Sequence, residues 1–359
     1  MIKNANVEML GGKSFVDLFC GIGCMRYALE SFGAKCVFSS EWDEHCKDAY
    51  EANHGDRPAG DITQILARDI PKHDIICAGF PCQAFSISGK MKGFADERGR
   101  GNLFQEITRI ASVHKPEMLI LENVGNLLSH DGGNTLAVIV ESLNAIGYDV
   151  QHRVLDASLF GVPQHRERIF FLCTYGKPAP FLTDPKPNMI SLNDVLQAPD
   201  ETRKYEIDVK SLQGFELDYS QKQARSEPIR VGKIQGGRQG ERIYSSSGHA
   251  ITLSSGGGGI GAKTGLYLVG DVVRRLSPRE CARITGIPEA YVLPRSDSQA
   301  YRQFGNALVV DVVQRIVESA FSEEPEDIFA AEDIAADACE GKSFSAGEKV
   351  EGKANQSAE

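Results

Sequence analysis

The chain has 359 residues, of which 42% are apolar and 25% charged, and its formal net charge is −10 at pH 7. This mixture is typical of a globular protein that is long enough for one large domain or two of ordinary size. No apolar stretch approaches the length of a membrane span, the first residues do not resemble a signal peptide, and the nine cysteines show no CxxC spacing. We therefore expect a cytoplasmic protein with reduced thiols, no metal site and no membrane association.

The negative charge is concentrated at the C-terminal end. Residues 321–359 hold eleven acidic residues and three lysines, which is −8 and leaves −2 for residues 1–320. We expect 323–359 to be an acidic, disordered tail, apart from a helix that continues to about residue 335. Residues 222–242 carry six basic side chains against two acidic ones. The overall charge therefore does not exclude an anionic polymer as a partner.

Short β-rich runs alternate with helical patterns along the first half of the chain. Such alternation predicts an α/β fold with a doubly wound, mostly parallel sheet of about six or seven strands, covered by helices on both faces. The expected strands are 14–19, 36–40, 74–79, 118–122, 148–155 and 168–174, and the expected helices are 23–32, 43–53, 103–114 and 134–146.

The second half begins with mixed polar sequence that is rich in glycine, including GGRQGERIY (236–244) and SSGGGGIGAKTG (254–265). Glycine weakens regular structure and allows the backbone to approach a ligand closely. Helical patterns return at 277–286, where Ser277 can cap a helix before Pro278, and at 298–320. We expect a first catalytic and cofactor-binding part at 1–188, a small domain at 189–273, and a segment at 274–322 that rejoins the first part.

The first expected strand turns through Gly21-Ile22-Gly23 into a helix, which is where doubly wound sheets bind nucleotides. The third glycine of a dinucleotide fingerprint is missing, so this turn alone is equally consistent with a plain strand-to-helix connection. The next strand is followed by Glu41, placed to reach ribose hydroxyls, and by Trp42, the only tryptophan, which can stack on an adenine. Together these features favour an adenosine-containing cofactor and leave NAD and S-adenosylmethionine open.

The stretch AGFPCQAFS places Cys82 directly after a proline, beyond the end of the third expected strand. A lone cysteine is more often a small buried hydrophobe than a nucleophile. Here, however, a loop with several glycines and basic residues follows, and Glu122 ends the next strand, so a thiol and a carboxylate meet at one crevice. Arg166 and Arg168 occupy alternate positions of QHRER and can face the same side.

Seven motifs occur in an order that resembles the DNA (cytosine-5)-methyltransferase family: FCGIG, Glu-Trp, Gly-Asp-Ile, Gly-Phe-Pro-Cys-Gln, Glu-Asn-Val, QHRER and Gly-Asn. The resemblance covers roughly residues 13–320. It implies a sheet of the S-adenosylmethionine-dependent methyltransferase type and the transfer of a methyl group to C5 of cytosine, with S-adenosylhomocysteine as the product. A covalent adduct between Cys82 and C6 of a flipped-out cytosine is the implied route.

The resemblance also implies roles for individual residues. The catalytic residues would be Cys82, Glu122, Arg166 and Arg168. The cofactor-binding residues would be Phe19, Gly21, Ile22, Gly23, Glu41, Trp42, Asp61, Ile62, Leu103 and Asn306. The DNA-binding residues would be Ser88, Gln239, Arg242 and Gly259, and no metal is expected.

The implied partner is double-stranded DNA, bound by a monomer that acts beside a restriction endonuclease of the same specificity. The stretch GGRQGERIYS resembles members of the family that read GCGC and methylate the inner cytosine, with Arg242 bidentate to a guanine. The chain departs from the family pattern at Gly256, where an aromatic residue is expected, and at Ala307-Leu308, and it is slightly longer between Gly99 and Leu103.

Three alternatives stay open at this point. A tRNA cytosine-5 methyltransferase shares the catalytic motifs, but the recognition region resembles one that reads DNA. A non-catalytic DNA-binding regulator on the same scaffold would not need the catalytic and cofactor residues together. A dehydrogenase would leave Cys82 without a role.

Overall fold

The computed structural model of the protein describes residues 8–81, 103–180, 190–218, 227–256 and 264–321. Residues Met1–Phe321 form one compact unit that contains two sheets. The expected helix near residue 335 and the acidic tail lie outside the described residues, as do Cys82, Ser88 and Gly259. Among the described helices none is long and apolar enough to cross a membrane.

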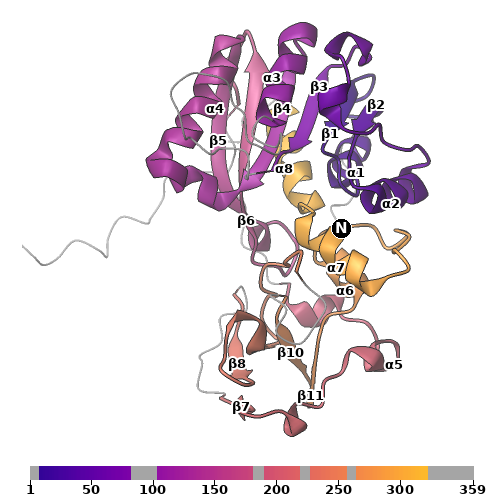
Figure 1. Ribbon diagram of the computed structural model, residues 1–359, viewed down its shortest axis with the longest axis vertical. Helices are drawn as coiled ribbons and strands as arrows, with labels where there is room; N and C mark the ends of the chain where they lie inside the picture. Colours follow the sequence, from indigo (N-terminus) through magenta and orange to yellow (C-terminus); the bar gives the residue numbers. More distant parts are fainter. Residues whose placement is uncertain (1–7, 82–102, 181–189, 219–226, 257–263, 322–359) are drawn as a thin grey trace, which may run out of the picture. The chain divides into compact units, whose positions relative to one another are not determined.

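The larger sheet has six strands in the order β2-β1-β3-β4-β6-β5 (Figure 1). Strands β1 to β4 are parallel, and β6 runs antiparallel to both of its neighbours. The expectation of a doubly wound, mostly parallel sheet is thus confirmed. The strands are β1 Ser14–Leu18, β2 Lys35–Ser40, β3 Ile75–Gly79, β4 Met118–Val124, β5 Tyr148–Asp156 and β6 Glu167–Tyr175.

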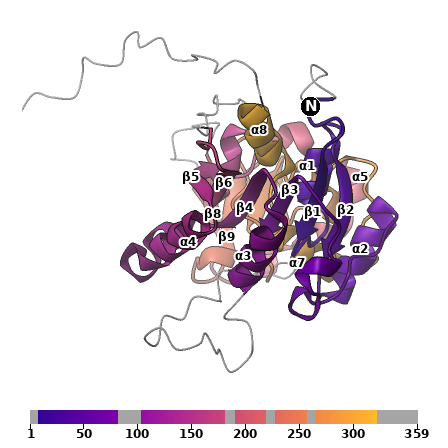
Figure 2. The same cartoon turned by 90° about the horizontal axis from the view of Figure 1, so that it is seen from above.

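Helices cover both faces of this sheet, because successive strand side chains point in opposite directions. On one face, inward residues such as Phe15 and Ile120 pack against Leu29 of α1 (Cys24–Glu30) and Val313 of α8 (Val310–Phe321). On the other face, the neighbouring strand residues pack against α3 (Leu103–His114) and α4 (Asn134–Ala145). Figure 2 shows the strands between α8 on one side and α3 and α4 on the other.

The smaller sheet has its own apolar core and the strand order β11-β10-β9-β8-β7. All neighbouring pairs are antiparallel except β9 with β10. A short helix, α5 (Pro199–Thr202), precedes it. The strands are β7 Glu216–Leu217, β8 Arg230–Lys233, β9 Arg242–Ser245, β10 Leu266–Val269 and β11 Val272–Arg274.

The C-terminal helices return to the large sheet. Helix α6 (Pro278–Arg283) begins as expected, with the Ser277 hydroxyl accepting a hydrogen bond from the Glu280 N–H at 3.1 Å. The helical pattern expected over 298–320 is divided between two helices, α7 (Asp297–Asn306) and α8, with an extended Ala307 after α7. Periodicity continues across this break because Leu308 and Val309 are also buried.

Candidate active site

A cavity of about 620 Å³ lies at the carboxyl ends of β1, β2, β3 and β4. Ligands of doubly wound sheets bind at this edge. Residues between 299 and 308, from α7 and the segment that follows it, complete the wall. Nine of the ten expected cofactor residues line this cavity: Phe19, Gly21, Ile22, Glu41, Trp42, Asp61, Ile62, Leu103 and Asn306.

The carboxylate of Glu41 braces the first turn of the cavity. One oxygen accepts a hydrogen bond from the Gly21 N–H at 2.9 Å, and the other accepts from the N–H groups of Trp42 and Asp43, each at 2.9 Å. Burial raises the pKa of Glu41, and these three hydrogen bonds act in the opposite direction. The backbone therefore fixes the position of the one acidic side chain that was expected to meet a ribose.

Gly23 shapes this turn from behind the cavity wall. It lies in the left-handed region at φ +86°, and a Cβ at this position would lie 2.1 Å from Nε2 of His54. Phe19 also adopts a positive φ, 55°, which is strained for a bulky side chain and costs of order 1–3 kcal/mol. Such strain is often retained where the backbone must meet a ligand.

Three further expected residues, Trp42, Asp61 and Ile62, also line the cavity. The Trp42 side chain is 70% exposed, unusually high for an indole, so its ring is available for stacking. Asp61 caps the short helix Ile62–Gln64 by accepting the Thr63 N–H at 2.9 Å, while Ile62 itself is buried. These positions agree with an adenosine site, in which an apolar surface lies beside a hydrogen-bonding rim.

Glu122 and Arg168 form an ion pair at the inner end of the same cavity. Arg168 Nε lies 3.0 Å from a Glu122 carboxylate oxygen, and both side chains are mostly buried. Burial raises the pKa of Glu122, and this effect outweighs the opposing attraction of Arg168 and Arg166. The strand β4 continues to Val124, so Glu122 lies two residues before its end rather than at the end as expected.

The end of β3 is aligned directly with this ion pair. Gly79 is in register with Glu122, and a Cβ on Gly79 would lie 3.4 Å from a Glu122 carboxylate oxygen. The next residue, Phe80, accepts a hydrogen bond at its carbonyl from the Asn123 side chain at 2.9 Å. Pro81 lines the cavity and immediately precedes Cys82, which lies outside the described residues.

Arg166 lies in a different place from the one expected for a residue that touches the substrate. Its side chain is 2% exposed and is not part of the cavity wall. Its guanidinium donates to the carbonyls of Leu253 and Gly305, each at 3.0 Å, and of Ala307 at 2.5 Å. Burial lowers its pKa to about 9, which still leaves the group charged at neutral pH.

Of the expected DNA-reading residues, Gln239 and Arg242 are described, and neither belongs to the cavity wall. Gln239 is exposed and begins a short helix, Gln239–Glu241, whereas Arg242 is half-buried and begins β9. The Arg242 Nε donates to the Gly237 carbonyl at 3.3 Å, which leaves the terminal nitrogens of its guanidinium without a hydrogen bond among the described residues.

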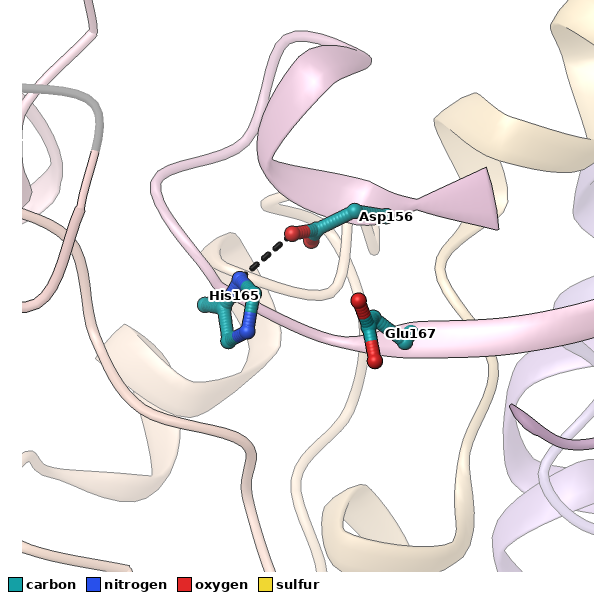
Figure 3. A group of neighbouring side chains, drawn as sticks. All are labelled: Asp156, His165 and Glu167. Atoms are coloured by element: carbon teal, nitrogen blue, oxygen red, sulfur yellow. Dashed lines mark ion pairs between the residues drawn. The ribbon is translucent and has the colours of Figure 1, made fainter. Parts of the chain in front are cut away.

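The one His and carboxylate group with metal-like spacing in the described ranges consists of Asp156, His165 and Glu167 (Figure 3). The Asp156 carboxylate is already used by two backbone N–H groups, those of Ser158 and Arg166, and by an ion pair with the His165 ring. This ion pair raises the pKa of His165. The group therefore acts as a brace between the end of β5 and the start of β6.

Comparison with known proteins identifies the family and the fold. The profile of the C-5 cytosine-specific DNA methylases matches residues 13–322. The type II methyltransferase M.HhaI of Haemophilus parahaemolyticus is 48% identical over 319 residues, covering 86% of this chain and 94% of that protein. The chain belongs to the C-5 cytosine-specific DNA methylase family. M.DsaV of Dactylococcopsis salina, also a type II methyltransferase, is 40% identical over 86% of each chain.

Solved methyltransferase structures share the fold of this methylase. The crystal structure of the S. pombe Dnmt2 methyltransferase superposes with a TM-score of 0.67 at 19% identity, covering 85% of this chain and 97% of that one. A putative DNA modification methyltransferase from an Escherichia coli prophage gives 0.60 at 17% identity, with coverages of 86% and 98%. The close resemblance to M.HhaI and the enzyme class expected from the sequence are confirmed.

Three polar residues of the methylase cavity were missed from the sequence. Both carboxylate oxygens of Asp17, the hydroxyl of Ser40 and the amide oxygen of Gln303 are buried without a hydrogen-bond partner in the described part of the chain. Burial raises the pKa of Asp17 well above its usual value. A carboxylate inside the apolar run SFVDLF was the signal that could have revealed Asp17, because buried acids are rare unless they have a partner.

The cavity wall of the methylase is acidic. Five carboxyl groups line it, against two arginines. Arg302 is already paired with Asp43 at 3.1 Å, and Arg168 with Glu122. The remaining carboxyl groups, those of Asp17, Glu41 and Asp61, favour a ligand that carries positive charge.

Proposed function

We propose that this methylase transfers a methyl group from S-adenosylmethionine to C5 of a flipped-out cytosine in a short duplex DNA sequence, through a covalent adduct between Cys82 and C6. The observation that carries the proposal is the buried Glu122–Arg168 ion pair, which lies beside the end of β3, three residues before Cys82. A carboxyl group and a guanidinium thus meet in a cavity that is large enough for a nucleoside-type cofactor, and Cys82 directly follows Pro81 of the cavity wall in the sequence.

The wall of the cavity fits S-adenosylmethionine. The cofactor carries a sulfonium and an ammonium group, and the acidic wall complements both. The partnerless oxygens of Asp17, Ser40 and Gln303 are suited to accept hydrogen bonds from a ligand ammonium, once small shifts of the wall expose them. We assign the adenosine to Trp42, Asp61 and Ile62, and the ribose to Glu41, with Phe19, Leu103 and Asn306 completing the wall.

When bound, S-adenosylmethionine supplies the methyl group as an electrophile. The residues of the chain make the cytosine able to accept it. The Cys82 thiolate forms a bond to C6, and the ring electrons shift so that C5 becomes nucleophilic. Glu122, whose pKa is raised by burial, stabilises in its protonated form the negative charge that develops at N3, and Arg168 holds Glu122 and the base. After the methyl group has passed to C5, a water molecule accepts the C5 proton, the C5–H electrons re-form the C5–C6 double bond, and the Cys82 thiolate leaves from C6.

We infer that the residues of the smaller sheet select the DNA sequence. Gln239 and Arg242 are accessible at the start of β9, and Arg242 can present paired N–H donors to a guanine. Together with Ser88 and Gly259 they would read GCGC and replace the flipped inner cytosine. The proposed small domain is 189–273, between a catalytic part at 1–188 and its return at 274–322, with the acidic tail at 323–359.

The partner of the reaction is DNA, and we further propose that the enzyme acts as a monomer beside a restriction endonuclease of the same specificity. The type II methyltransferase names of its relatives support that context. Methylation of the recognition sequence would then protect the cell's own DNA.

Transfer of labelled methyl from S-adenosylmethionine to defined duplexes tests the proposed function. We expect incorporation into a GCGC duplex and none into the same duplex with the inner cytosine replaced by 5-methylcytosine. Cys82→Ser should abolish transfer, and the control is Cys173→Ser, which changes a buried cysteine of β6 that does not line the cavity. Transfer to tRNA but not to DNA would contradict the proposal.

A further inference from the structure

Three segments that are far apart in the sequence meet beside the cavity at a contact that we call the joint. They are residues 163–166 before β6, residues 250–254 after β9, and residues 305–307 at the C-terminal end of α7. Main-chain hydrogen bonds run from Ala250 to the Pro163 carbonyl at 2.8 Å and from His165 to the Ala250 carbonyl at 2.9 Å. The two chains therefore pair like short strands, as the parallel bridge between Gln164 and Ala250 also indicates.

Two buried side chains connect the joint internally. Gln164 is fully buried, accepts the Leu253 N–H at 3.2 Å and donates to the Ile284 carbonyl at 2.7 Å. Arg166 donates to the carbonyls of Leu253, Gly305 and Ala307, as described above. The Arg166 guanidinium thus hydrogen-bonds both to residues 250–254 and to residues 305–307. Arg166 also lies two residues before Arg168.

The joint is also tightly packed. An added Cβ on Gly305 would lie 2.2 Å from the main-chain atoms of Ser254 and Ser255. Gly305 directly precedes Asn306, which lines the cavity. The segment that follows β9 therefore rests against the cofactor side of the cavity without any intervening side chain.

The backbone of Arg166 is itself held in place. Asp156 accepts the Arg166 N–H at 2.9 Å and pairs with the His165 ring, so the brace in Figure 3 fixes the start of the joint. A buried network of this kind has few alternative arrangements, because any displacement would leave buried polar groups without partners.

We propose that Arg166 is a positioning residue through which DNA bound by the smaller sheet and cofactor bound in the cavity strengthen each other's binding. This inference rests on the proposed function. A shift of residues 250–254 on DNA binding moves the Leu253 carbonyl, and Arg166 transmits the shift both to the Gly305–Ala307 wall and to Arg168. Linkage then requires that the cofactor product raise DNA affinity by the same factor by which DNA raises product affinity.

The test measures DNA affinity by fluorescence anisotropy, with and without saturating S-adenosylhomocysteine. For the unaltered protein we expect the product to tighten DNA binding by at least about fivefold, the lower end of typical couplings. Arg166→Lys should reduce that factor to less than about twofold, because a single ammonium cannot bond three carbonyls in the same geometry. Product binding without DNA should remain measurable by calorimetry in both proteins.

Arg274→Lys is the matched control. Arg274 is 3% exposed and is held by a two-point ion pair with Glu280 at 2.8 Å, so its substitution also disturbs a buried arginine. We expect this variant to lose stability and to keep the coupling factor. Gly305→Ala is a second variant of the joint, which should lower the coupling factor by forcing Ser254 away, and it decides the question if Arg166→Lys does not fold.

Two results would overturn the inference. The first is a coupling factor below twofold in unaltered protein that methylates DNA. The second is an undiminished coupling factor in folded Arg166→Lys or, if that variant does not fold, in Gly305→Ala. Either result would remove the inference and leave the proposed function intact. Absence of methyl transfer by the unaltered protein would remove the proposed function, and this inference with it.

Discussion

Substitution of Glu122 by glutamine tests the chemistry of the site. Glutamine keeps the shape and can still accept a hydrogen bond from Arg168, but it cannot hold or release the proton. General acid and base groups contribute about 10²–10⁴ in rate, which corresponds to about 2.7–5.4 kcal/mol of activation free energy. Because the amide preserves part of the contact, we expect kcat to fall by about 10², at the lower end, with little change in KM for DNA.

The pH dependence gives the same test a second readout. Because burial raises the pKa of Glu122, the carboxyl group keeps its proton to a higher pH than an exposed glutamate does and loses it as the pH rises through the raised pKa. We expect the single-turnover rate of the unaltered enzyme to fall across that window, and the Glu122→Gln rate to lack this particular fall.

The matched control for Glu122→Gln is Glu280→Gln, which alters another buried glutamate paired with an arginine, far from the cavity wall. We expect it to lower stability and to leave the single-turnover rate within about threefold of the unaltered enzyme. A Glu122→Gln rate within twofold of the unaltered enzyme, or an equal loss in Glu280→Gln, would refute the assigned role.

Three further substitutions test the cofactor side of the cavity. The pKa of Asp17 is higher in the folded protein than its unfolded value of 3.8, so the free energy of unfolding falls as the pH rises from about 3.8 through the raised pKa. Asp17→Asn should remove this fall, as measured by urea denaturation at several pH values. The same variant should bind S-adenosylhomocysteine about tenfold more weakly in calorimetry. Trp42→Ala should raise the dissociation constant of the same ligand by about three- to tenfold while changing the unfolding free energy by no more than about 0.5 kcal/mol, since the ring is exposed. Gly23→Ala should cost about 2 kcal/mol or more, because a Cβ would meet His54. Gly12→Ala, at φ +79° with open space around it, should cost less, and equal losses would contradict the packing explanation.

Local pattern was sufficient to predict most of the large sheet. All six of its strands and the four helices between them lie within a few residues of their expected positions, because alternation and turn residues are local signals. The break after α7 was not predicted. The Gly305 and Ala307 carbonyls turn toward Arg166, which lies about 140 residues earlier in the chain, and helical periodicity contains no information about such a contact.

Some residues of the candidate site could be predicted from local sequence, and others could not. Glu41, Trp42 and Glu122 could be placed because each lies within two residues of the end of a strand, and strand ends meet at one edge of the sheet. Arg166 could not be placed correctly, since its alternation with Arg168 says which side of a strand it faces but not that other segments cover it. Asp17 was missed because a single acid in an apolar run shows no ligand until the cavity around it is known.

The central claim is that a covalent bond forms between Cys82 and the target cytosine. A duplex with 5-fluorocytosine at the inner position of GCGC tests it most directly, because fluorine at C5 cannot leave as a proton and the bond to Cys82 cannot then be broken by elimination. With S-adenosylmethionine present, we expect a denaturation-resistant protein–DNA adduct whose peptide mass locates the attachment at Cys82, and no adduct with Cys82→Ser. Methylation of ordinary GCGC duplexes without any adduct on the fluorinated one, or an adduct at another residue, would contradict the account.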